Sequence, residues 1–196
     1  MRPVTRRVLI VEDEHEVAEL YRGYLDDYDV AVANTGAEAL ELVDADTDAV
    51  LLDRRLPDTS GAEVLASIRD RGLDCRVAMV TAVEPDIDIV EMGFDLYLVK
   101  PATRDDIQSA VERLGTRAQY DDALKRTASL VTKRAVLEAE RTPAELRSSP
   151  EYDDLLDSIE SLQSDLDDLA SAFSADDYRM LFREMGDSQS SASESV

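Results

Sequence analysis

The chain has 196 residues, of which 44% are hydrophobic and 33% are charged, and its formal net charge is −23. This length suits one domain of ordinary size with a smaller appendage, and the hydrophobic fraction is sufficient for a packed core. No run approaches the roughly 18 uninterrupted apolar residues of a membrane-spanning helix, so we expect a soluble protein with no membrane role.

The acidic excess is accompanied by few lysines, at positions 100, 125 and 133 only. Dispersed carboxylates keep a protein hydrated when salt screens ordinary charge effects, which favours a halophilic source. An acidic protein from a non-halophilic organism is the alternative. The same charge disfavours non-specific nucleic-acid binding, because contacts to phosphates require Lys and Arg.

The amino-terminal basic residues run into an apolar stretch that is too short for the core of a signal peptide. We therefore predict a cytoplasmic protein. The single cysteine, Cys75, cannot form an internal disulfide, which suits a reducing compartment, and we expect it to be packed in the core.

Short aliphatic runs alternate with amphipathic segments through the first hundred residues. The runs expected as strands are residues 8–11, 29–33, 49–52, 77–80 and 96–99. The segments expected as helices are 14–25, 37–43, 62–69, a short piece at 87–92 and a helix opening after Thr103. Runs that are apolar on both faces are typical of parallel strands covered by helices on each side, so the pattern predicts an α/β fold with a doubly wound, five-stranded parallel sheet.

The residues beyond Gly115 are expected to be helical only. The segment 119–140 contains no Pro or Gly, and Thr142-Pro143-Ala144-Glu145 has the capping residue, early proline and acid of a helix start. A similar start at Ser148-Ser149-Pro150-Glu151 opens a last helix. The Ser-rich residues 186–196 show no periodicity, and we expect them to be disordered.

The last helix carries one apolar seam with steps of four and three residues, formed by Leu155, Ile159, Leu162, Leu166, Leu169 and Phe173. The seam is short for an independent coiled coil. We therefore predict an α-helical hairpin in which this helix folds back on residues 117–140, with self-dimerisation as the alternative.

Segment 116–150 is the one locally basic part of the chain, with Arg117, Lys125, Arg126, Lys133, Arg134, Arg141 and Arg147. These residues could form a nucleic-acid-binding face or could pair with the acidic last helix. Residues eight apart drift around a helix instead of stacking on one side, so we favour the pairing.

Polar side chains lie at the carboxyl ends of four expected strands. Glu12 and Asp13 follow the first strand, Asp53 ends the third, Thr81 ends the fourth and Lys100 ends the fifth. In doubly wound sheets, sites form outside these strand ends. Carboxylates brought together repel one another unless a cation lies among them, and an all-oxygen ligand set suits Mg²⁺. The pattern therefore predicts a Mg²⁺ site at this edge.

In this order the residues resemble the CheY-like, flavodoxin-like receiver domain of two-component response regulators, over residues 6–115. The resemblance is carried by Val11-Glu12-Asp13-Glu14, Leu51-Leu52-Asp53-Arg54-Arg55-Leu56-Pro57-Asp58-Thr59-Ser60-Gly61, Thr81-Ala82 and Tyr97-Leu98-Val99-Lys100-Pro101. Any one of these motifs alone would be weak, whereas the ordered combination is specific.

The resemblance implies that Asp53 accepts a phosphoryl group from a sensor histidine kinase and forms an acyl phosphate. It further implies that Glu12, Asp13, Asp53 and the backbone carbonyl of Arg55 bind Mg²⁺. Lys100 would compensate the charge of the phosphoryl oxygens.

Three further roles follow from the same resemblance. Thr81 would hydrogen-bond a phosphoryl oxygen, and Tyr97 would rotate inward as Thr81 moves, although Tyr97 could simply be packed. The peptide bond before Pro101 would be cis. The only histidine, His15, lies one turn from the acidic pair, and we expect it to be a solvated surface residue.

Two departures from the family pattern are expected to matter. Arg55 places a bulky cation beside the acceptor, where smaller residues are frequent, and should change the lifetime of the phosphoryl group. The stretch between Thr81 and Lys100 is short, so the helix there and the face it offers to partners should be reduced.

Residues 116–185 resemble the HalX-type region that follows receivers in haloarchaea, through Arg117-Ala118-Gln119-Tyr120-Asp121-Asp122-Ala123-Leu124, Ala139-Glu140-Arg141-Thr142-Pro143-Ala144-Glu145-Leu146 and Pro150-Glu151-Tyr152. We expect this segment to relay the state of Asp53 through a homodimer or a helical protein partner.

Two other functions compete with this interpretation. Phosphorylation-controlled transcription through DNA binding is favoured by the basic segment, but no helix-turn-helix with a basic recognition helix is recognisable. A Mg²⁺-dependent phosphatase would use the same carboxylates, but Arg55 stands two residues after Asp53 where a second acid would be needed. We therefore expect a phosphoryl acceptor and not an enzyme.

Overall fold

The computed structural model describes residues 6–83 and 92–171. The chain divides into two compact units between Ala118 and Gln119. The expected short helix at 87–92, Phe173 of the apolar seam and the serine-rich segment 186–196 lie wholly or mostly outside the described residues.

The first unit is built on a parallel sheet whose strands, among the described residues, have the order β2-β1-β3-β4-β5. They are β1 (Arg7–Val11), β2 (Asp29–Ala33), β3 (Ala49–Leu52), β4 (Arg76–Thr81) and β5 (Leu96–Val99). This is the strand order of flavodoxin-like sheets, and it confirms the predicted α/β fold. The pairing of Val11 with Leu52 and of Leu52 with Met79 keeps the carboxyl ends of the three central strands close to one level.

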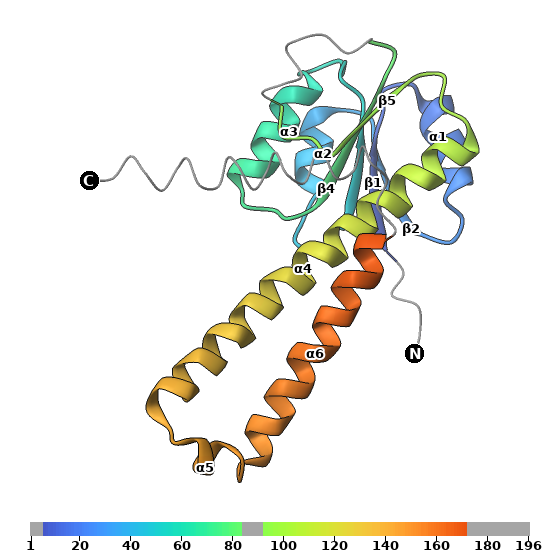
Figure 1. Cartoon of the computed structure of the whole chain (residues 1–196). Helices are drawn as coiled ribbons and strands as arrows, with labels where there is room; N and C mark the ends of the chain where they lie inside the picture. Colours follow the sequence, from blue (N-terminus) through green and yellow to red (C-terminus); the bar gives the residue numbers. More distant parts are fainter. Residues whose placement is uncertain (1–5, 84–91, 172–196) are drawn as a thin grey trace. The chain divides into compact units, whose positions relative to one another are not determined.

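Helices cover both faces of the sheet (Figure 1). Helix α1 (His15–Tyr24) and the first turns of α4 (Arg104–Glu140) bury Tyr21, Ile107 and Leu114 against one face. Helices α2 (Gly36–Leu42) and α3 (Gly61–Asp70) bury Val64 and Ile68 against the other. Because each strand is apolar on both sides, the two cores form back to back and hold the strand ends in place.

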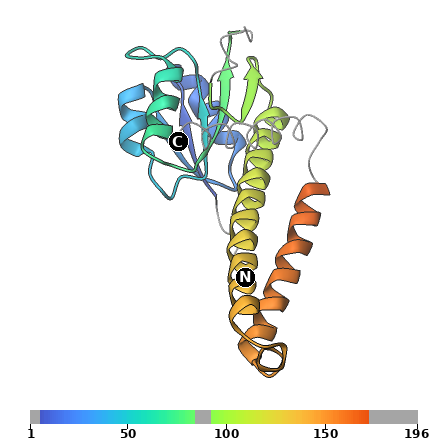
Figure 2. The same ribbon diagram turned by 60° about the vertical axis from the view of Figure 1, so that its left-hand side comes forward.

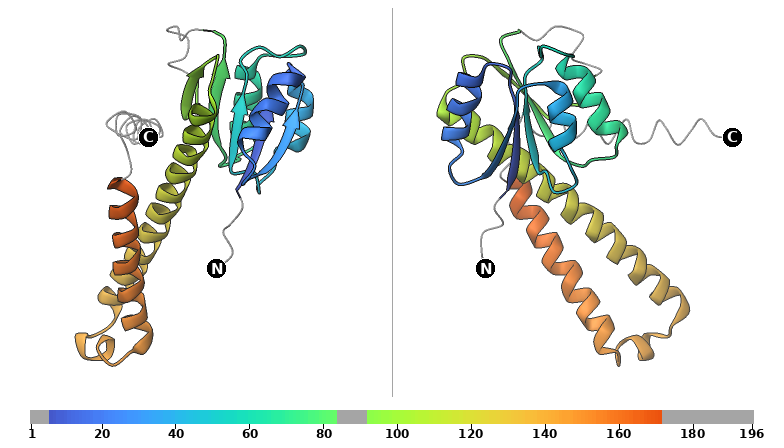
Figure 3. Two further views of the ribbon diagram at one scale, coloured as in Figure 1. Left: turned by 90° about the vertical axis from the view of Figure 1, so that its right-hand side faces the viewer. Right: turned by 180° about the vertical axis from the view of Figure 1, so that it is seen from behind.

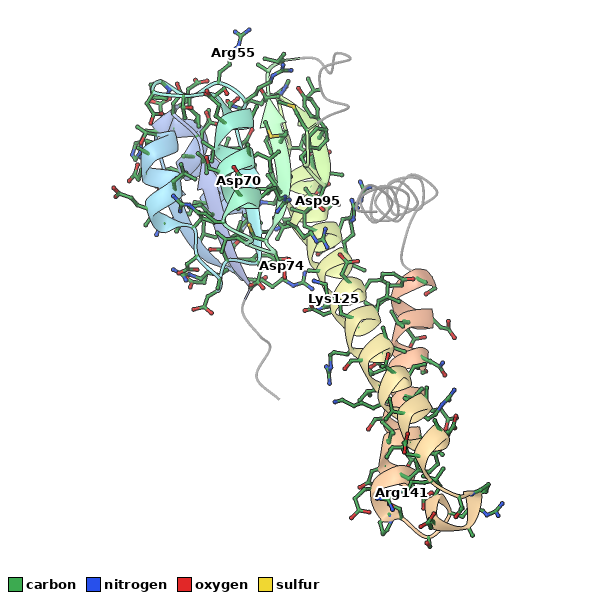
Figure 4. All side chains as sticks on the ribbon, turned by 90° about the vertical axis from the view of Figure 1, so that its left-hand side faces the viewer. Arg55, Asp70, Asp74, Asp95, Lys125 and Arg141 are labelled. Atoms are coloured by element: carbon green, nitrogen blue, oxygen red, sulfur yellow. The ribbon has the colours of Figure 1, made fainter. Side chains whose placement is uncertain are left out.

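A buried ionic cluster joins the amino-terminal ends of β4 and β5, at the far end of the sheet from the predicted site. Asp95, which is 2% exposed, accepts hydrogen bonds from Arg69 (3.2 Å), Arg76 (2.8 Å) and the backbone amide of Val77 (2.8 Å). The buried Arg117 donates to the backbone carbonyl of Asp95 (2.8 Å). Figure 4 labels Asp95 at this position. Several donors offset the cost of burying one carboxylate, as a buried charge requires.

Helix α4 is longer than the sequence pattern indicates, because the helix opening after Thr103 and the helix over 119–140 are one element of 37 residues. It runs through Gly115 without a break. Glycine costs a helix interior only about 1 kcal/mol relative to alanine, so flanking residues that favour the helix can carry it across. A side chain at Gly115 would meet the guanidinium of Arg6, the flexible end of a long side chain that can move aside.

The second unit contains the rest of α4, the short helix α5 (Pro143–Leu146) and α6 (Pro150–Ser171). Residues 119–140 and α6 run side by side in opposite directions, as Figures 2 and 3 show. The predicted capping box at Thr142 and Glu145 is present, and the seam residues Ile159 and Leu162 are buried. The predicted helical hairpin is therefore confirmed.

Candidate functional site

The predicted site residues converge at the carboxyl-terminal edge of the sheet. Glu12 follows β1 and is 2% exposed, Asp53 follows β3 and is 7% exposed, and Thr81 ends β4 at 1% exposure. Asp13 lies beside Glu12 and is exposed. Each side chain is placed by the strand that precedes it, because the two packed cores fix where the strand ends.

Lys100 joins the two buried carboxylates. Its ammonium nitrogen lies 2.6 Å from Glu12 Oε2 and 2.6 Å from Asp53 Oδ2. The second oxygen of each carboxylate accepts a hydrogen bond from a backbone amide. The Glu14 amide donates to Glu12 Oε1 (3.3 Å), and the Arg55 amide donates to Asp53 Oδ1 (3.1 Å). One cation therefore holds two negative side chains in a largely dry setting, and brings β5 to the ends of β1 and β3.

Burial and charge act in opposite directions on this group. Burial raises the pKa of Glu12, and the hydrogen bond and charge of Lys100 only partly offset that effect. Burial alone would lower the pKa of Lys100, but hydrogen bonds to Asp53 and Glu12 outweigh it, and the pKa of Lys100 is raised. We expect Lys100 to carry its charge at neutral pH.

An oxygen-rich position for a cation lies beside Lys100. In the part of the chain that the structure describes, Glu12, Asp13 and Asp53 form a group whose candidate ligand oxygens all lie within 4.8 Å of one another. Hard carboxylate oxygens suit Mg²⁺, and two of the three carboxylates are largely removed from solvent. The donor set therefore fits the predicted ion.

A hollow of about 310 Å³ opens beside the carboxylates, large enough for a phosphoryl group and water. It is lined by Asp13, Glu14, Asp53, Arg55, Thr81, Ala82, Val83 and Lys100. The Arg55 side chain is exposed and points away from the domain at this end (Figure 4). Its predicted contribution to metal binding concerns the backbone carbonyl, whereas the contact that the structure shows is made by its backbone amide.

Tyr97 is tied to the loop that follows Thr81. Its hydroxyl donates a hydrogen bond of 2.7 Å to the backbone carbonyl of Val83, whose amide lies 3.3 Å from Thr81 Oγ1. The ring packs against Phe94, with centroids 5.5 Å apart. A displacement of Thr81 would therefore reach Tyr97 through Val83.

The loop between Asp53 and α3 is held by contacts that sequence reasoning missed. The Asp58 carboxylate accepts hydrogen bonds from the amides of Gly36 (2.8 Å) and Ala37 (2.9 Å), at the amino terminus of α2. A side chain on Gly61 would meet the backbone carbonyl of Asp53. Both residues lie in the quoted acceptor motif, but their partners are distant in sequence or on the backbone, so no local pattern signals them.

Three other expectations from the sequence are confirmed. The bond between Lys100 and Pro101 is cis, His15 is exposed and Cys75 is buried. No helix within the described residues is both long and apolar enough to cross a bilayer. Residues 84–91, eight of the 18 between Thr81 and Lys100, lie outside the described part of the chain, so the expected reduction of the helix there stays a prediction.

Two known protein families match successive parts of the chain. Residues 8–112 match the family model of the response regulator receiver domain, and residues 116–182 match that of the HalX domain. The first match alone covers more than half of the 196 residues.

Similar proteins include a "Putative transcriptional regulator" of Haloferax volcanii, 42% identical over 84% of this chain and 28% of its own length. The response regulator MprA of Mycobacterium leprae is 35% identical over 62% of this chain and 56% of its own length. The present chain thus spans between about a quarter and somewhat over half of these relatives.

Among solved structures, the response regulator TrrA of Thermotoga maritima, in complex with Mg²⁺ and beryllium fluoride, has a TM-score of 0.50 and 30% identity. The match covers 56% of this chain and 99% of TrrA. Fold, strand-end residues and family matches agree: the chain belongs to the response regulators of two-component systems, with a receiver domain followed by a HalX domain.

Proposed function

We propose that Asp53 accepts a phosphoryl group from the phosphohistidine of a sensor histidine kinase, in the presence of Mg²⁺, and that the C-terminal helices relay this state. The observation that carries the proposal is the position of Asp53, a largely buried carboxylate held 2.6 Å from Lys100 beside two further acids. Such a group has the orientation and the charge balance that phosphoryl transfer needs.

The transfer step balances as follows. A carboxylate oxygen of Asp53 forms a bond to phosphorus while the bond from phosphorus to the imidazole nitrogen breaks, and the imidazole leaves with the electron pair. Glu12, Asp13 and Asp53 would hold Mg²⁺, which supplies positive charge next to the phosphoryl oxygens. The Lys100 ammonium is placed to exchange its contact with Asp53 for a contact with a phosphoryl oxygen.

Thr81 and Tyr97 are the proposed switch. The Thr81 hydroxyl would turn toward a phosphoryl oxygen and draw the backbone at Val83, which holds the Tyr97 hydroxyl in this structure. Exchange of a few hydrogen bonds is enough to shift an equilibrium between two conformations. We infer that the chain acts as an acceptor, with at most slow self-dephosphorylation, and that it works in the cytoplasm.

The test is labelling with a small phosphoryl donor such as acetyl phosphate and Mg²⁺, followed by mass mapping of the modified residue. We expect one phosphoryl group on Asp53, with no labelling of Asp53→Asn or in the presence of a chelator. Asp70→Asn, an exposed aspartate on α3 outside the site, is the matched control and should label normally. Labelling that survives Asp53→Asn would refute the assignment.

Transcription control is the second candidate, since the Haloferax volcanii relative bears that name and segment 116–150 is basic. It requires DNA binding that weakens steeply with salt and depends on Arg126 and Lys133. Both residues lie in one groove with acidic residues of α6, which would repel phosphates. Protein contact through the helices is therefore the favoured output.

A further inference from the structure

The helical hairpin buries little of its own apolar surface. Of the described residues beyond Ala118, the buried side chains are Ala123, Thr127, Ile159 and Leu162. Leu124 is 42% exposed and Val136 is 58% exposed. Two helices alone rarely repay the entropy of ordering, since most helix stability comes from packing an apolar face against other elements. We therefore expect the exposed apolar side chains of the hairpin to pack against a further element.

A groove runs along one side of the hairpin, between residues 119–133 and α6. It consists of two hollows of about 700 Å³ and 490 Å³ that share Arg126, Leu162 and Asp165. Leu130, Leu162 and Leu169 contribute apolar lining. A groove of this length between two helices, with leucines among polar and charged lining residues, has the shape to take another helix.

The two walls of the groove differ in charge. The charged residues on the α4 side are Arg126 and Lys133 with one acid, Asp122, whereas those on the α6 side are all acids, Asp157, Asp165 and Asp168. In the part of the chain that the structure describes, none of these six side chains forms an ion pair. Charged groups that face a common groove without partners favour an occupant that presents the complementary charges.

We propose that the groove is a homodimer interface, in which the hairpins of two chains pack face to face as a four-helix bundle. Under two-fold symmetry, the basic wall of one copy meets the acidic wall of the other, and the reciprocal pair forms at the same time. One surface thus supplies both halves of the charge complementarity. A second copy is the occupant that meets this condition without any further protein.

The available area agrees with a dimer. Helix α6 has 22 residues and is about 33 Å long. A face of two adjacent helices about 20 Å wide then offers about 650 Å² on each copy, or about 1,300 Å² in total, within the range of stable interfaces. The proposal concerns the hairpin and does not depend on phosphoryl transfer to Asp53.

The test uses charge reversal in the full chain, with molar mass measured by light scattering or sedimentation at about 0.1 M salt. The wild type should be a dimer. Arg126→Glu with Lys133→Glu, and separately Asp157→Lys with Asp165→Lys, should each weaken dimerisation about a hundredfold, because like charges then face each other in both symmetric contacts. An equimolar mixture of the two variants should restore a dimer containing one copy of each.

Matched controls separate the interface from net charge and from folding. Asp153→Lys with Asp167→Lys makes the same charge change on α6 outside both hollows and should leave the dimer intact. A chain carrying all four reversals is again self-complementary and should dimerise, even if one of the double variants loses helix content by circular dichroism. At about 1 M salt the effects of reversal should shrink.

Three outcomes would overturn the proposal. A wild-type chain that stays monomeric up to about 100 μM would leave the groove to another protein or to the residues beyond Ser171. Dimers that are indifferent to both double reversals would place the interface elsewhere. Failure of the mixed variants and of the four-fold variant to pair would exclude the crossed charge arrangement.

Discussion

Replacement of Lys100 by methionine should destabilise the receiver domain strongly in the absence of Mg²⁺. The side chains of Glu12, Asp53 and Lys100 are 2%, 9% and 13% exposed, and both ion pairs measure 2.6 Å. Removal of the cation leaves two buried carboxylates facing each other, and the loss of one partner from a buried ionic group costs about 3–5 kcal/mol. We expect a loss of about 4 kcal/mol and a midpoint lower by roughly 10 °C.

A double-mutant cycle separates this charge effect from simple loss of packing. In an Asp53→Asn background one of the two carboxylates is already neutral, so Lys100→Met should cost about 2 kcal/mol less than in the wild type. Mg²⁺ at about 100 times its dissociation constant should add about 2.7 kcal/mol to the wild type and more to Lys100→Met, where no other cation balances the carboxylates.

The measurement is urea or thermal unfolding followed by circular dichroism, with a chelator or with Mg²⁺. Arg147→Met, which removes an exposed cation from the second unit outside the groove, is the matched control and should change stability by no more than about 0.5 kcal/mol. Equal losses for Lys100→Met in both backgrounds would contradict the proposed charge balance, as would an unchanged midpoint.

Three further predictions concern the loop around Asp53. Gly61→Ala should lower the free energy of unfolding by about 1–3 kcal/mol and slow the labelling of Asp53, because the new methyl group meets the Asp53 carbonyl. The control Gly23→Ala adds a methyl group in open space and should be neutral or stabilising. Equal effects of the two substitutions would contradict the close approach at Gly61. Arg55→Ala should shorten the lifetime of the acyl phosphate about threefold, measured by loss of label, because Arg55 is one of the residues that line the hollow and a smaller residue there widens the approach for water. An unchanged lifetime would refute that role. Hydrogen bonds from the Ala37 and Gly36 amides lower the pKa of Asp58, so its stabilisation is complete above about pH 4 and is lost as pH falls below that value; Asp58→Asn should flatten this part of the acid-unfolding profile, and an unaltered profile would count against the contact.

The sequence by itself determined the elements of the fold and the edge at which the site forms. Aliphatic runs such as Ala49–Leu52 are local signals, and a parallel sheet has to bring the ends of such runs to one side. The placement of Glu12, Asp53 and Lys100 at a common edge therefore followed from strand order alone. The helix starts at Thr142 and Pro150 were equally legible, because a cap is made by residues within one turn.

The tertiary structure decided the features that depend on partners distant in the chain. Asp58 caps α2, Gly61 lies against the Asp53 carbonyl, and Asp95 gathers two arginines, yet none of these has a periodic or adjacent sequence signal. Helix α4 likewise continues through Gly115, because the residues on either side favour the helix by more than the low helix propensity of one glycine costs. The groove of the hairpin exists only because two helices meet with a particular facing, and the sequence pattern of each helix alone does not set that facing.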